Sequence, residues 1–118
     1  MSSLHEQIRA RTKQFAIRIV KAVQRLPKTD EARIMGKQLL RAGTSVAANY
    51  RAVGRARSKA EFIAKMGIVV EEADETVFWL EPLVETSLVR KELVQELLTE
   101  ANELLAIFAA SHRTAKAQ

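Results

Sequence analysis

Cysteine is absent from the sequence, and proline, glycine, histidine and aromatic residues are scarce. Without cysteine the chain can form no disulfide, no thiolate metal site and no cysteine nucleophile. Only four glycines and two prolines interrupt 118 residues, of which 47% are hydrophobic. Ala, Leu, Glu, Lys and Arg dominate, which is the composition of long helices and not of a sheet with many turns. Length and apolar content predict one domain with one core.

Long apolar runs are also missing. Residues 1–10 carry charged side chains and lack the apolar segment of a secretory leader. No stretch approaches the roughly 18 uninterrupted apolar residues of a membrane-spanning helix. We therefore expect a cytoplasmic protein with no membrane contact.

Four segments carry apolar residues at spacings of three, four and seven, the pattern of helices with one buried face. The stripes are Leu4, Ile8, Phe15, Ile19, Ala22, Val23 and Leu26; Met35, Leu39, Ala42, Val46, Tyr50 and Val53; Phe62, Met66, Val69, Ala73, Val77 and Leu80; and Leu93, Leu97, Ala101, Leu104, Leu105 and Phe108. Short connections separate them, the last near residues 86–88. The pattern predicts an all-α fold, an antiparallel up-down-up-down four-helix bundle over residues 1–112, with a disordered tail at 113–118.

Local signals mark the helix ends. Proline stops the first segment, and Thr29 or Asp30 can cap the second by accepting a backbone N–H. Ser58 is the expected N-cap of the third, with Glu61 as its capping-box partner. Pro82 is expected to kink or fray the last turn of that helix. Within the second segment, the small residues 43–45 permit close contact with another helix.

The net charge of +5 conceals a strong asymmetry. Residues 1–60 hold 14 basic and 3 acidic residues, a net charge of +11, whereas residues 61–118 hold 5 basic and 11 acidic residues, a net charge of −6. This distribution fits complementary packing within the bundle, head-to-tail packing between subunits, or a basic outer face for a polyanion, and these do not exclude one another.

Basic residues also recur at helical spacing. On the second segment, the cations opposite the apolar stripe, with two that follow them, are Arg33, Lys37, Arg41, Arg51, Arg55, Arg57 and Lys59. On the first segment Arg11, Arg18 and Arg25 follow a heptad spacing, which fits a solvated edge as well as a binding surface.

No catalytic or metal-binding motif is apparent. His5 and His112 lie near opposite ends of the chain, and the Glu-x-x-His motif required by bundle-type metal cages is absent. The sequence also lacks a glycine-rich phosphate loop, a Ser-His-Asp grouping and a nucleophile elbow. We predict no enzymatic activity, no cofactor and no metal. A site assembled between subunits is the one enzymatic alternative that remains open.

Asn49 lies near the apolar stripe of the second segment, where a buried amide needs hydrogen-bond partners. We expect it to be buried and to bond across to another helix, at Glu72 or Glu75, which would then also be buried polar residues. A registry-fixing core residue and a direct functional role are both open.

Phe78 and Trp79 are adjacent, so both cannot face one core squarely. At least one should be partly exposed and form part of an oligomer interface, since aromatic residues are favoured interface anchors. The alternative is that a wide core accommodates both rings.

Residues 41–81, RAGTSVAANYRAVGRARSKAEFIAKMGIVVEEADETVFWLE, resemble the 23S rRNA intervening-sequence protein family. The specific pieces are Thr44-Ser45-Val46, Asn49-Tyr50-Arg51, 55–59, Phe62-Ile63 and 71–79, and the likeness extends over nearly the whole chain. It implies a bacterial antiparallel four-helix bundle, often a homopentamer, with no known catalysis and a nucleic-acid role. A related basic pentamer accompanies the reverse transcriptase of diversity-generating retroelements. Many relatives carry Glu three residues after the Asn, where this chain has Ala52.

Two functions from different classes follow. The leading hypothesis is a non-enzymatic oligomer that binds RNA or DNA phosphates through the basic residues on and after the second segment, without reading base sequence. The alternative is a protein-interaction or scaffold module whose basic stripe meets an acidic face of another subunit or of a partner protein.

Overall fold

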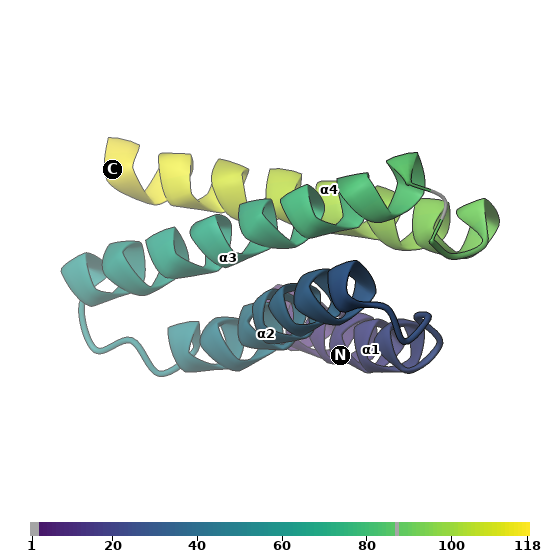
Figure 1. Cartoon of the computed structure of the whole chain (residues 1–118). Coiled ribbons are helices and arrows are strands. Elements are labelled where there is room, and N and C mark those ends of the chain that lie inside the picture. The colour runs from purple at the N-terminus through teal and green to yellow at the C-terminus, as the bar shows by residue number, and fades with distance from the viewer. Residues whose placement is uncertain (1–2, 87) are drawn as a thin grey trace.

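The computed structural model describes residues 3–86 and 88–118 and contains four helices. These are α1 (Leu4–Gln24), α2 (Asp30–Val53), α3 (Lys59–Glu85) and α4 (Lys91–Ala117), shown in Figure 1. Ser87, in the predicted third connection, lies outside the described residues, as do Met1 and Ser2. The predicted all-α, up-down bundle is confirmed.

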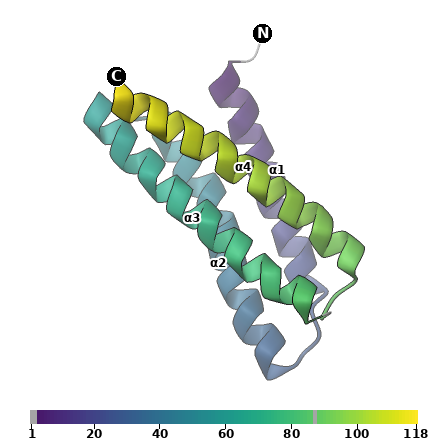
Figure 2. The ribbon, with the colours of Figure 1, turned by 90° about the horizontal axis from the view of Figure 1, so that it is seen from above.

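The helices pair into two layers, α1 with α2 and α3 with α4 (Figure 1). Consecutive helices contact one another extensively, whereas α1 and α4 meet over a smaller area. Figure 2 shows the first turns of α1 diverging from the last turns of α4. The molecule measures 46 × 27 × 18 Å. No helix in the described part of the chain is long and apolar enough to cross a membrane.

Hydroxyl side chains cap three of the four helices. Ser3 Oγ accepts a hydrogen bond from the Glu6 N–H at 3.1 Å, Thr29 Oγ1 from the Ala32 N–H at 3.3 Å, and Ser58 Oγ from the Glu61 N–H at 3.0 Å. Each bond satisfies an N–H that has no partner within its own helix. Arg90, the residue before α4, makes no such side-chain bond.

The predicted stripes form one continuous core. Phe15 and Ile19 of α1, Leu39 and Val46 of α2, Met66, Val69 and Leu80 of α3, and Leu97, Leu104 and Phe108 of α4 are almost fully buried. Several residues at the stripe edges, such as Met35, Phe62 and Leu105, are only partly buried and pack against this core. The buried polar residues, Thr12 and Thr76, direct their hydroxyls to carbonyls one turn earlier in their own helices.

One prediction about a chain segment was wrong. The 113–118 tail is not disordered, because α4 continues to Ala117 and the side chain of Ala115 is buried. Lys59, at the start of α3, also donates a hydrogen bond to the carbonyl of Gln118. Pro82 lies in the last turn of α3, which ends at Glu85, and the Pro82 carbonyl accepts hydrogen bonds from the N–H and the hydroxyl of Thr86. A kink or fraying at this turn stays a prediction.

Gly43 marks a close approach of α2 to α1. A Cβ atom at this position would lie 3.0 Å from two side-chain carbons of Ile19, which is completely buried. The expectation that residues 43–45 allow close helix contact is therefore confirmed at Gly43.

Candidate nucleic-acid interface

Ion pairs divide the basic face that was predicted on α2. Arg41 Nη1 lies 3.2 Å from Glu72 Oε2, and its Nη2 donates to Glu75, so this side chain links α2 to α3. Arg33 pairs with Asp30 in the first turn of its own helix. Both arginines remain exposed, but their charges are partly neutralised within the chain.

The other predicted cations are exposed and lie in different surroundings. Lys37 and Arg51 project from α2, whereas Arg55 follows the end of that helix at Val53. Arg57 Nε lies 3.7 Å from Glu61 Oε2, and Lys59 reaches the C-terminal residue. The predicted set is therefore not a single uniform stripe.

A basic groove lies between α1 and α2, and of its three cations the sequence predicted only Arg51 as a binding residue. Its volume is about 530 Å³, and its lining residues are Glu6, Arg9, Ala10 and Lys13 from α1 and Thr44, Ala47, Ala48 and Arg51 from α2. Small side chains form much of the lining and leave room between the cations. The positions of Arg9 and Lys13, one helical turn apart and off the apolar stripe, were the available signal.

Arg9, Lys13 and Arg51 line the groove and make no ion pair within the described residues. Glu6 is the one carboxylate among the lining residues. Three cations and one carboxylate give the lining a net charge of +2, which produces a local positive potential. Lys and Arg in such a position attract phosphate oxygens without discriminating between bases. We define Arg9, Lys13 and Arg51 as the groove cations.

The opposite flank of α1 is different, because its arginines pair with α4. Arg11 Nε and Nη2 donate to the Glu100 carboxylate at 2.8 and 2.6 Å, and Nη2 also lies 3.2 Å from Glu103. Arg18 lies 3.9 Å from Glu96. The hydrogen bond from Arg11 lowers the pKa of Glu100, and the same bond raises the pKa of Arg11. Complementary packing within the bundle thus accounts for part of the charge asymmetry.

Comparisons with known proteins agree on one family. The model of the 23S rRNA-intervening sequence protein family matches residues 5–110. A crystal structure from Bacteroides thetaiotaomicron, described as a protein of unknown function from the S23 ribosomal protein family, has 33% sequence identity and a TM-score of 0.82, covering 89% of this chain and 97% of that one. No match was found among curated proteins.

The chain belongs to the 23S rRNA-intervening sequence protein family. The resemblance found in residues 41–81 is therefore confirmed. The described fold matches that of the Bacteroides protein across nearly all of both chains, so the two-layer bundle is shared.

Asn49 belongs to the segment that resembles the 23S rRNA-intervening sequence family. The expected hydrogen bond from its side chain to α3 is not formed within the described part of the chain. Its Nδ2 donates to the carbonyl and the Oγ of Ser45, both at 2.9 Å, within α2. Asn49 is only half-buried, and so are Glu72 and Glu75, which pair with Arg41 instead. The amide is satisfied one turn back along its own helix, so a partner across the core is not required. Ala52, where many relatives have Glu, is half-buried in the last turn of α2.

The adjacent aromatic residues of this family member differ in exposure, as predicted. Phe78 is 54% exposed, whereas Trp79 is half-buried and packs against the core. Their ring centroids lie 4.9 Å apart in an edge-on arrangement. The Trp79 Nε1 atom is buried and has no acceptor within the described residues. Their role at an oligomer interface remains a prediction.

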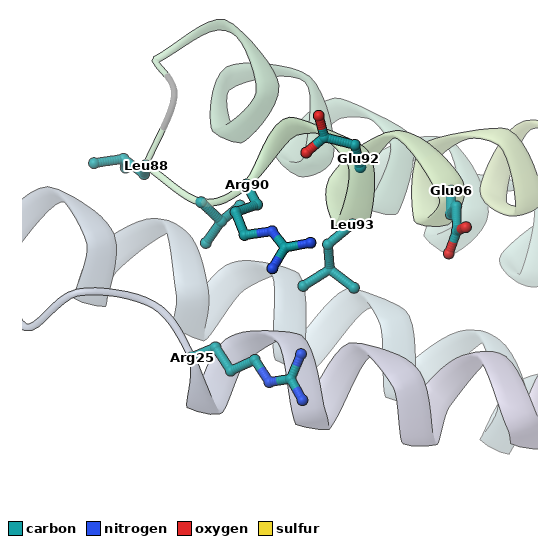
Figure 3. A pocket seen from close by; sticks show the side chains of 7 residues that line it. Arg25, Leu88, Arg90, Glu92, Leu93 and Glu96 are labelled. Atoms are coloured by element: carbon teal, nitrogen blue, oxygen red, sulfur yellow. The ribbon is translucent and has the colours of Figure 1, made fainter.

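A second cavity, of about 440 Å³, lies where the start of α4 meets the end of α1. Figure 3 shows Arg25, directly after α1, and Arg90, directly before α4, extending into the space beside Leu93. Glu92 and Glu96 also line this cavity, so its charges are mixed. It is therefore a weaker candidate for a polyanion than the basic groove.

The rings of the two histidines pack against neighbouring residues. The His5 ring stacks on Tyr50 with centroids 4.9 Å apart, and Tyr50 in turn contacts Phe108. His112 lies beside Gly67, where an added Cβ would be 3.4 Å from its Nε2. The described residues contain no group of three His, Asp or Glu side chains placed to hold a metal ion.

Proposed function

We propose that the protein is a non-enzymatic oligomer that binds nucleic acid by contacting phosphates with the α1/α2 face. The observation that carries this proposal is the basic groove, where Arg9, Lys13 and Arg51 converge from two helices without ion-pair partners in the described residues. Arg11, Arg18, Arg33, Arg41 and Arg57 lie in ion pairs with acidic residues, whereas the three groove cations do not and are free to neutralise phosphates.

The proposed phosphate-binding surface includes only some of the basic residues predicted from the sequence. Arg51 and Lys37 remain candidate phosphate contacts, and Arg55 and Arg57 can extend them beyond the end of α2. Arg41 is less suited, because a phosphate would compete with Glu72 and Glu75 for its guanidinium. Arg9 and Lys13 take its place in the proposed surface.

Salt dependence tests this function directly. Neutralising three phosphates of a duplex releases counterions and gives a slope of about −2.7 for log K against log salt, which is roughly a 40-fold loss of affinity between 50 and 200 mM. Fluorescence anisotropy with labelled RNA and DNA of mixed sequence would measure it. Absence of binding at 50 mM salt, by protein whose molar mass shows it to be assembled, would overturn the proposal.

A protein-interaction module is the second candidate, and the exposed Phe78 beside Trp79 favours it. A large exposed aromatic ring such as that of Phe78 is a feature that a partner surface can cover. We propose that this part of α3 forms a contact between subunits of a homo-oligomer; five is the number implied by the family resemblance. Light scattering with and without nucleic acid gives the subunit number.

A further inference from the structure

The nucleic-acid contacts available on the α1/α2 face are electrostatic, with no exposed aromatic ring beside them. The aromatic residues of α1 and α2 are Phe15 and Tyr50, which are 2% and 7% exposed, and the half-buried His5 ring is stacked on Tyr50. Phe78, which is exposed, belongs to α3. Single strands gain about 1–3 kcal/mol per base by stacking on aromatic side chains, and this face lacks such a platform.

Cations that form no ion pair within residues 3–86 and 88–118 lie at both ends of the α1/α2 face. The groove cations are at one end, and Lys28 and Lys37 line a second, mainly apolar groove at the other, beside the turn between the helices. Lys37 and Arg51 are about four turns apart on α2, which places them on one side of the helix and roughly 21 Å apart along its axis.

Duplex and single strand differ in how they meet such a row of charges. Double-stranded DNA carries one phosphate charge per roughly 1.7 Å of axis, about twice the density of a single strand. It is also stiff over about 150 base pairs, so it need not be ordered to lie along a rigid pair of helices. A flexible strand loses conformational freedom when it is held straight.

We infer that the α1/α2 face binds double-stranded nucleic acid in preference to single strands. This inference rests on the proposed function. The groove cations together with Lys37 give four phosphate contacts, and counterion release has a slope of about −0.9 per contact for duplex and −0.7 for single strands. Taking equal affinities at about 1 M salt, this difference in slope makes the duplex bind about six-fold more tightly than a single strand at 0.1 M.

The test compares a DNA duplex of about 24 base pairs with each of its strands, chosen to be free of self-pairing. Concentrations are matched by total phosphate, so that the second strand of the duplex gives no statistical advantage. We expect the duplex to bind at least about five-fold tighter at 0.1 M salt and to show the steeper salt dependence. The Arg9→Glu/Arg51→Glu variant should lose this preference while keeping its helical circular dichroism.

The outcomes separate the inference from the function on which it rests. Equal or tighter binding of single strands would overturn duplex preference and leave nucleic-acid binding intact. Failure to bind either form at 50 mM salt would overturn both. A duplex preference that persists in the Arg9→Glu/Arg51→Glu variant would overturn the assignment to the α1/α2 face.

Discussion

The ion pair between Arg11 and Glu100 is predicted to stabilise the contact between α1 and α4. Arg11→Met removes the guanidinium but keeps an apolar stem of similar length, and Glu100→Gln removes the carboxylate charge. The bidentate hydrogen bonds are 2.8 and 2.6 Å long, and the side chains are 35% and 17% exposed. The pair is therefore neither a fully solvated ion pair nor a buried one.

The expected magnitude lies between two known cases. Exposed ion pairs contribute about 0.2–1 kcal/mol, and hydrogen bonds to charged groups contribute about 1.5–3 kcal/mol. Allowing for solvent screening at Arg11, we expect a coupling free energy of about 1–2 kcal/mol in a double-mutant cycle. Loss of the pair should lower the melting temperature by about 4 °C per kcal/mol for a domain of this size.

Urea unfolding at fixed protein concentration would measure the four members of this cycle, since oligomerisation makes stability depend on concentration. The Arg33–Asp30 pair, whose side chains are 60% and 87% exposed, is a matched control and should give less than about 0.5 kcal/mol. A coupling for Arg11–Glu100 no larger than that of this control would refute the reasoning.

The same pair predicts a pH dependence. Because Arg11 lowers the folded-state pKa of Glu100 below its ordinary value of 4.5, the stabilisation is present above that value. It is lost as the pH falls through the lowered pKa of the folded state. Wild type and Arg11→Met should therefore differ in stability at pH 7 and converge in strong acid. Convergence at neutral pH or a constant difference down to pH 2 would contradict this explanation.

Two further predictions concern packing and assembly. Gly43→Ala should destabilise the fold by about 1 kcal/mol, because crowding of the new Cβ against the stiff, buried Ile19 outweighs the gain in helix propensity. Gly67→Ala should stabilise the fold by about 1 kcal/mol, because its new Cβ would make only ordinary van der Waals contacts. Thermal melts of both variants check this, and stabilisation by Gly43→Ala would show that the helices can separate freely. Phe78→Ser should reduce the molar mass in light scattering if this ring is a subunit contact, while Ile34→Ser, at an exposed residue of α2, should not. An unchanged mass for Phe78→Ser would remove this residue from the interface.

Helical periodicity predicted the fold well because burial in a bundle follows a repeat of about 3.6 residues. The stripe residues Leu39, Val46 and Phe108 are buried, and the caps at Thr29 and Ser58 lie where hydroxyl residues precede helices. The tail at 113–118 was misjudged because its composition is polar, although Ala115 provides an apolar contact that extends α4.

The candidate site was harder to predict, because a helical wheel does not show where the neighbouring helix lies. Arg41 is outward by angle, but its long side chain reaches carboxylates on α3. Asn49 lies at the edge of the stripe, where its amide bonds to Ser45 in its own helix. Arg9 and Lys13 gain their importance only when the turn between α1 and α2 brings them beside Arg51.

The most direct test of the proposed interface compares two charge reversals of equal size. Arg9→Glu/Arg51→Glu alters the basic groove, and Lys91→Glu/Arg113→Glu alters exposed cations of α4 by the same net charge. At 50 mM salt the groove variant should bind a mixed-sequence duplex on the order of 100-fold more weakly than wild type, because two phosphate contacts are lost. The α4 variant should stay within about three-fold, since net charge alone has a screened effect. Equal losses in both variants, or no loss in the groove variant, would contradict the assignment of phosphate binding to the α1/α2 face.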